Sequence, residues 1–237
     1  MSKPVLIIET GQPVRPLRRH GGFPHWIRVA AGMPREAVHV CAVHAGEPLP
    51  EHAQVSAAIV TGSGAMVTDR EPWSEATAQW IRAGADQSLP MLGICYGHQL
   101  IAHAFGGTVG DNPAGREMGT VQVQRLAAAG ADPLLGTAPE RFAAQTTHLQ
   151  TVLQAPPGAV VLARSPQDPC QALRIGERIW GLQFHPEFSA TVMRGYLAAR
   201  ADRLRAEGAD PQALAAAVTA TPRARAVLRR FVRHAFA

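Results

Sequence analysis

The sequence has 237 residues, which at roughly 150 residues per domain suits one domain, or one domain with an appended segment. Hydrophobic residues make up 46% and charged residues 17%, a balance that supplies a sizeable core and excludes a disordered chain. The formal net charge is +5, but no nucleic-acid-binding motif accompanies it, so we do not expect a nucleic-acid partner.

The sequence also argues against a membrane or secreted protein. No apolar run approaches the ~20 residues needed to span a bilayer. The first residues carry one lysine and a short apolar stretch that breaks at Gly11, which predicts a β-strand rather than a signal peptide. Cys41, Cys95 and Cys170 are too sparse for a disulfide framework and include no C-x-x-C pair for zinc. We therefore expect a cytoplasmic protein.

Short apolar runs bounded by Gly and Pro predict strands that are buried on both faces. These runs cover residues 5–8, 38–43, 57–61, 91–94, 160–163 and 179–184. Helical patterns at residues 73–84 and 96–105 lie between them, and residues 109–124 resemble a hairpin with a loop. This alternation predicts an α/β fold with a mainly parallel central sheet.

The composition changes after residue 190, where the chain becomes rich in Ala and Arg. Pro211 and Pro222 mark helix starts. One apolar stripe follows the second proline, with arginines largely off it. Its members are Ala224, Val227, Leu228, Phe231 and Val232. We expect a main domain over residues 1–190 and a helical extension over 191–237 that packs on it. For the last helix we expect a solvated basic face; a partner-docking helix or an RNA-facing patch are the alternatives.

The most informative segment is a predicted strand that runs into Gly93-x-Cys95-x-Gly97 and leaves as a helix. This pattern is that of a nucleophile elbow, in which flanking glycines allow a strained turn and close chain approach. The helix N-terminus favours a thiolate at Cys95. A buried structural cysteine beside two turn glycines is the alternative.

A second motif places His185 at the end of a predicted strand, followed by Pro186 and Glu187. A carboxylate two residues after the histidine can bond the far ring nitrogen, which fixes the tautomer and stabilises an imidazolium. Alone this motif is weak, because a loop histidine is the default. Together with the cysteine elbow it predicts a nucleophile, a base and an orienting group.

With these motifs the sequence resembles the class I, or triad-type, glutamine amidotransferases over roughly residues 4–190. The matching pieces are residues 92–99, 181–187 and the glycine turn 60–64. The resemblance implies a flavodoxin-like three-layer α/β domain that hydrolyses the side-chain amide of glutamine and passes ammonia to a synthetase domain or partner subunit. More narrowly, the chain is similar to stand-alone members related to the GMP synthase glutaminase domain.

The resemblance also implies residue roles. Cys95 would form a γ-glutamyl thioester, His185 would act as acid and base, and Glu187 would orient His185. The backbone N–H groups of Gly62 and Tyr96 would form the oxyanion hole. The substrate contacts would be Gln99, Thr147, His148 and Leu149.

Two departures from the family pattern bear on these roles. The turn at residues 61–65 lacks the Gly-Pro pair of many members, which leaves Gly64 as the alternative to Gly62. The segment after His148 lacks the family's Gly and acidic residue, so a glutamate side chain or a larger γ-glutamyl group are open alternatives to glutamine.

Three functions therefore stay open. The first is one subunit of an amidotransferase, the second a free-standing γ-glutamyl hydrolase or peptidase, and the third a regulatory protein without turnover. Thiol chemistry on an amide needs no metal or organic cofactor, so none is expected.

Three further patterns are interpreted as structural. His98 and His103 are five residues apart, which does not suit a metal site on a helix. Arg116 and Glu117 are interpreted as a structural ion pair. The loop with His20 and His25 is expected at the surface rather than over the site.

Overall fold

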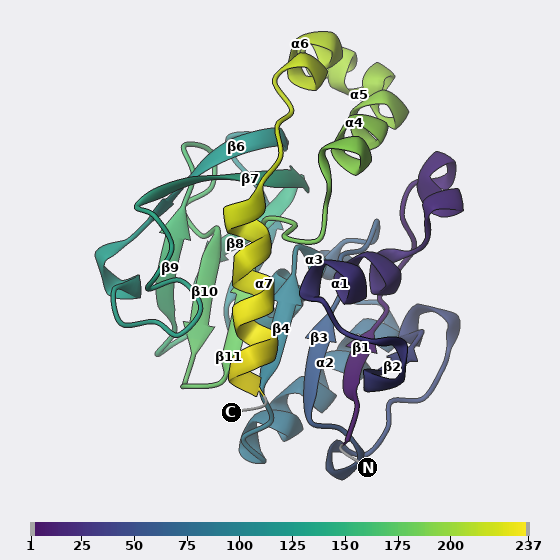
Figure 1. Ribbon diagram of the computed structural model, residues 1–237, viewed down its shortest axis with the longest axis vertical. Coiled ribbons are helices and arrows are strands. Elements are labelled where there is room, and N and C mark those ends of the chain that lie inside the picture. Colours follow the sequence, from purple (N-terminus) through teal and green to yellow (C-terminus); the bar gives the residue numbers. More distant parts are fainter. Residues whose placement is uncertain (1–2, 236–237) are drawn as a thin grey trace.

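Nine strands form one mixed sheet through the middle of the computed structural model, which describes residues 3–235 (Figure 1). In spatial order the strands are β2 (Val38–Cys41), β1 (Val5–Ile8), β3 (Ala57–Val60), β4 (Met91–Ile94), β11 (Ile179–Leu182), β10 (Ala172–Ile175), β9 (Val160–Arg164), β6 (Glu117–Arg125) and β7 (Arg141–His148). A separate antiparallel pair consists of β5 (Thr108–Asp111) and β8 (Gln150–Gln154).

The expectation of a mainly parallel sheet holds for half of it. The first five strands, from β2 to β11, are parallel, whereas β10, β9, β6 and β7 each pair antiparallel with their neighbours. Short connections between β9, β10 and β11 allow the antiparallel pairing, because only parallel neighbours need a long crossover.

The expected local hairpin at residues 109–124 is wrong: β5 pairs with β8, and β6 pairs with β7.

Two apolar layers cover the parallel half of the sheet. Val5 and Ile7 of β1 pack on one side with α1 (Phe23–Ala31) and α7 (Pro222–Ala235). Leu6 and Ile8 point the other way, toward α2 (Pro72–Asp86) and α3 (Tyr96–Ala104). Because successive side chains of a strand face opposite sides, this split produces the expected helix–sheet–helix arrangement.

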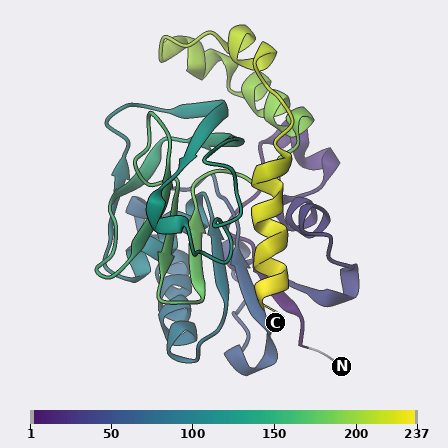
Figure 2. The same cartoon turned by 60° about the vertical axis from the view of Figure 1, so that its left-hand side comes forward.

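The C-terminal helices take two different positions (Figures 1 and 2). The short helices α4 (Ala190–Ala199), α5 (Ala201–Ala206) and α6 (Pro211–Ala216) project beyond one end of the sheet, and α7 returns along its face. Both prolines stand at the first position of their helices, as predicted. The boundary between residues 190 and 191 stays a prediction.

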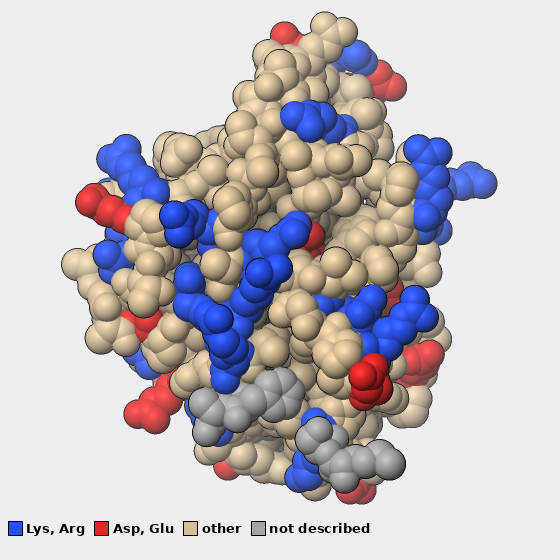
Figure 3. Space-filling model, viewed as in Figure 1, with Lys and Arg blue, Asp and Glu red and all other residues tan. Residues whose placement is uncertain are grey.

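The amphipathic pattern of α7 is confirmed. Four members of its apolar stripe are fully buried in the core beside the sheet. Basic side chains lie across the outer surface over α7 (Figure 3). Two arginines of this helix also bond to the rest of the domain: Arg229 donates to the carbonyl oxygen of Ala30, and Arg230 donates to that of Leu134. No helix among residues 3–235 is long and apolar enough to cross a bilayer.

Candidate active site

Cys95 lies at the tip of a strained turn between β4 and α3. Its backbone has φ 53° and ψ −103°, a region that costs a non-glycine residue of order 1–3 kcal/mol. A Cβ on Gly93 would lie 2.2 Å from the carbonyl oxygen of Gly97, and one on Gly97 would lie 2.4 Å from that of Val60. Both glycines are therefore required by close backbone approach, as the elbow motif predicts.

His185 follows β11, the neighbour of β4, so its position beside Cys95 comes from strand pairing. Its Nδ1 lies 2.7 Å from Oε1 of Glu187, and the ring stacks on Phe188 with 4.1 Å between ring centres. Both side chains of the His185–Glu187 pair are almost completely buried. Bonding at Nδ1 leaves Nε2 free toward the cavity, where it has no hydrogen-bond partner in the described part of the chain.

The charges of Cys95 and His185 support each other. Burial alone raises the pKa of the Cys95 thiol, but the attraction of His185 outweighs it, and the pKa is lowered. Burial opposes protonation of His185, yet Glu187 and the Cys95 sulfur raise its pKa to about 10. Both shifts act in the direction that favours a thiolate–imidazolium pair.

Gly62 lies closer to the reacting groups than Gly64. A Cβ on Gly62 would be 3.0 Å from Cε1 of His185 and 3.7 Å from Cβ of Cys95, whereas one on Gly64 would meet nothing within 4 Å. Tyr96 is the first residue of α3, where the backbone N–H has no intrahelical acceptor. These positions fit an oxyanion hole made by Gly62 and Tyr96, and the assignment of the two donors stays a prediction.

The cavity in front of Cys95 has a volume of about 150 Å³. It is smaller than the ~300–1,000 Å³ of drug-sized pockets, so it suits a small molecule. Its lining residues are Gln12, Pro13, Val14, Arg18, Phe23, Ser63, Gly64, Cys95, Thr147, His185, Tyr196 and Arg200. The segment after β1 thus does line the site, but His20 and His25 themselves lie on a separate groove.

The predicted substrate residues fall into two groups. Thr147 lines the cavity, and its carbonyl oxygen lies 4.0 Å from the Cys95 sulfur. The other three do not line it. Gln99 donates from Nε2 to the Gln150 carbonyl at 2.7 Å and to Oε1 of Gln183 at 2.9 Å, and Leu149 borders a different pocket. Their contact with substrate stays a prediction.

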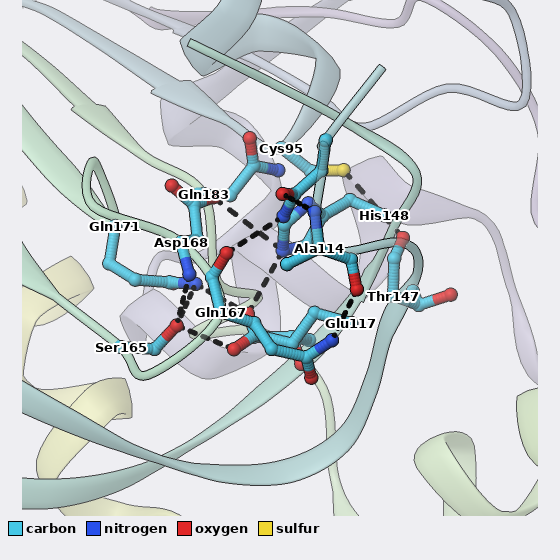
Figure 4. Close-up of polar contacts among 12 residues, drawn as sticks. Cys95, Ala114, Glu117, Thr147, His148, Ser165, Gln167, Asp168, Gln171 and Gln183 are labelled. Atoms are coloured by element: carbon cyan, nitrogen blue, oxygen red, sulfur yellow. Dashed lines mark hydrogen bonds and ion pairs between the residues drawn. The ribbon is translucent and has the colours of Figure 1, made fainter. Parts of the chain in front are cut away.

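His148 belongs to a buried polar network next to the cysteine (Figure 4). Its Nδ1 lies 3.0 Å from the Gln150 carbonyl and its Nε2 lies 3.0 Å from Oε2 of Glu117. Because both ring nitrogens face acceptors, this environment favours the imidazolium form of His148. Its pKa is raised: burial opposes the charge, but the bond to Glu117 and the nearby Asp168 outweigh this.

The expected ion pair between Arg116 and Glu117 is wrong. Glu117 is the first residue of β6 and points inward to His148, whereas Arg116 precedes the strand and bonds Glu207, just after α5, at 2.9 Å. Each of the two charges therefore has its partner on a different element. The interpretation of His98 as structural agrees with its complete burial.

Comparison with known proteins decides the family. The sequence profile described as glutamine amidotransferase class-I matches residues 35–201. This chain is a class I glutamine amidotransferase domain. The amidotransferase is also similar to one subunit of the glutamine-hydrolysing GMP synthase of Methanopyrus kandleri, with 32% identity over 73% of this chain and 87% of the relative.

Other relatives are longer proteins. The glutamine-hydrolysing GMP synthase of Aeropyrum pernix is 39% identical over 62% of this chain, but the match covers only 26% of its own length.

Among solved structures, a glutamine amidotransferase of Methylobacillus flagellatus has a TM-score of 0.77 and 26% identity over 98% of this chain and 95% of that one. One from Thermotoga maritima, at 22% identity and a TM-score of 0.78, covers 99% of this chain and 98% of its own and shares the fold.

Proposed function

We propose that this amidotransferase hydrolyses the side-chain amide of glutamine through a Cys95–His185–Glu187 triad. The observation that carries the proposal is the strained Cys95 elbow, which faces the same small cavity as the Glu187-bound imidazole. The pKa shifts of both reacting groups favour the charged pair that such chemistry needs.

The first half of the reaction would form a thioester. The Cys95 thiolate attacks the amide carbon, and the oxygen of the tetrahedral intermediate accepts hydrogen bonds from the N–H groups of Gly62 and Tyr96. His185 then donates its Nε2 proton to the departing nitrogen. The carbon–nitrogen bond breaks, and ammonia leaves a γ-glutamyl thioester.

The second half would return the enzyme to its starting state. His185, now neutral, accepts a proton from water, and the oxygen attacks the thioester carbon. The carbon–sulfur bond breaks and the thiolate leaves, so the sum is glutamine and water converted to glutamate and ammonia. Glu187 holds the imidazole in one tautomer and stabilises its charge throughout.

We further propose that the ammonia is used by a synthetase partner. The relatives from Methanopyrus kandleri and Pyrococcus abyssi are each named as one subunit of a glutamine-hydrolysing GMP synthase, which describes part of an assembly. On this proposal the isolated chain turns glutamine over slowly, and its partner accelerates the reaction.

The test is ammonia release from glutamine beside glutamate release from a γ-glutamyl dipeptide. Cys95→Ala should abolish turnover, and Cys41→Ala is the matched control, because Cys41 is also buried and free but lies on β2 at the sheet edge. Turnover of the dipeptide in preference to glutamine would replace the proposal by a γ-glutamyl hydrolase. No Cys95-dependent turnover of either donor would favour a regulatory protein.

A further inference from the structure

The wall of the Cys95 cavity carries a one-sided charge. Arg18 and Arg200 both line it, and no Asp or Glu is among the described residues that do so. Glu187, the carboxylate of the proposed triad, bonds the far side of the His185 ring and borders the separate groove near α1 instead. The space in front of the nucleophile is therefore positive, apart from the thiolate itself.

Arg200 has no counter-ion. Within residues 3–235 its guanidinium makes no hydrogen bond or ion pair, although arginines around it do. Arg116 and Arg203 both bond Glu207 at 2.9 Å, and Arg194 donates to the Val218 carbonyl at 2.8 Å. Arg200 is half-buried, and burial lowers the pKa of its guanidinium. A partly desolvated charge without a partner is unfavourable, so this position favours an incoming anion.

Aromatic stacking connects Arg200 to the catalytic histidine. The guanidinium carbon lies 5.9 Å from the ring centre of Tyr196, a distance suited to a cation–π contact. The Tyr196 ring packs on Phe188 at 5.0 Å, and Phe188 stacks on His185 at 4.1 Å. These contacts place the charge at a fixed position relative to the reacting groups.

The short helix that follows Arg200 is also anchored. Glu207, at the end of α5, bonds Arg116 on the body of the domain, whose side chain is only 6% exposed. Arg200 thus lies at the junction of α4 and α5. The packing of Tyr196 on Phe188 fixes α4, and the ion pair between Glu207 and Arg116 fixes the end of α5. This geometry presents the guanidinium to the cavity before substrate arrives, which reduces the cost of ordering it on binding.

We infer that Arg200, assisted by Arg18 at the mouth, forms a carboxylate-binding subsite for the γ-glutamyl donor. The inference rests on the proposed function and extends it, since it makes the C-terminal helices part of the substrate site. The carboxylate has two possible sources. It is either the α-carboxylate of the glutamyl unit, which glutamine itself carries, or a carboxylate on the leaving amine, as in γ-glutamylglycine.

The test measures binding rather than turnover, so that it does not depend on catalysis. Cys95→Ala protein is titrated by calorimetry with glutamine, γ-glutamylglycine and γ-glutamyl methylamide, alone and combined with Arg200→Met. Met keeps an apolar stem over Tyr196 but removes the charge. The control is Arg205→Met, because Arg205 is exposed and pairs with Asp202 on the same short helix.

A charge-assisted bond contributes about 1.5–3 kcal/mol, so Arg200→Met should raise the dissociation constant by about 10–100-fold. A rise for all three ligands assigns Arg200 to the α-carboxylate, whereas a rise confined to γ-glutamylglycine assigns it to the leaving group. Arg200→Lys should recover part of the loss, because it restores the charge without the planar fork.

Unchanged dissociation constants in Arg200→Met, or no binding of any of these ligands to Cys95→Ala protein, would overturn the subsite. Failure of the proposed function looks different. In that case the ligands bind with the predicted dependence on Arg200, but the wild-type protein does not hydrolyse glutamine.

Discussion

Gly62→Ala should damage catalysis without unfolding the protein. The new Cβ would lie 3.0 Å from Cε1 of His185, at least ~0.5 Å inside an ordinary carbon–carbon contact. The imidazole cannot easily move away, since Glu187 bonds one nitrogen at 2.7 Å and Phe188 stacks on its face at 4.1 Å. A displacement of catalytic groups by ~1 Å costs about 100-fold in rate. A displacement of ~0.5 Å therefore predicts about a tenfold loss of activity.

The matched control is Gly64→Ala, two residues along the same turn. A Cβ there meets no protein atom within 4 Å, and Gly64 does not have a positive φ, so the substitution adds no clash with His185 and no backbone strain. Because Gly64 lines the cavity, its methyl group would take substrate space and raise KM, so the comparison is made on kcat. We expect kcat within about threefold of wild type for Gly64→Ala and a thermal midpoint close to wild type for both variants. The assay is steady-state glutamine hydrolysis beside thermal unfolding.

Two results would refute this reasoning. Wild-type activity in Gly62→Ala would mean that His185 shifts freely or does not take part. An equal loss in both variants would mean that the whole turn, rather than the approach of Gly62 to the imidazole, determines the rate.

Three further outcomes are expected. Turnover should fall as pH rises through about 10, the pKa of His185, because the imidazolium proposed to protonate the departing nitrogen is lost. A pH profile of kcat/KM checks this. Glu117→Gln should lower the free energy of unfolding by about 3–5 kcal/mol in urea titrations, because it breaks a buried ion pair with His148. The pKa of His148 is higher in the folded protein than in the unfolded chain, where it is about 6.5. The loss of stability should therefore be largest below about pH 6.5 and should shrink as the pH rises through the pKa of the folded protein. Phe231→Ala should cost about 3–5 kcal/mol in the same assay, while Arg233→Ala, which is exposed, should stay within about 0.5 kcal/mol.

The parallel part of the fold was predictable because its strands are continuous apolar runs. The strand Val5–Ile8 is completely buried, and such segments stand out in any sequence. Among the antiparallel strands only β9 carries such a run, at residues 160–163. Strand β7 reads Arg-Phe-Ala-Ala-Gln-Thr-Thr-His and β10 reads Ala-Leu-Arg-Ile, so polar residues interrupt both. Their identity as strands depends on pairing with their neighbours in the sheet.

The elbow and its histidine were recognisable because each requires particular residues close together in the chain. Gly93 and Gly97 leave no space for a side chain, and Glu187 must lie within reach of His185. The pairing of His148 with Glu117 had no such local signal. Their 31-residue separation is bridged only when β6 and β7 pair in register, which places Glu117 opposite His148.

Arg200 illustrates where sequence reasoning stops. It follows an Ala-rich helix among many arginines, and nothing local separates it from Arg203 or Arg205. The difference is visible only in three dimensions: those two arginines pair with carboxylates, and Arg200 faces the cavity of a nucleophile that lies 105 residues earlier. The helical extension that the sequence predicts to pack on the domain therefore also carries an arginine that lines the cavity of the nucleophile. If Arg200 binds the donor, the helices beyond β11 contribute to substrate selection as well as to packing, and their loss should weaken donor binding even where the triad is intact.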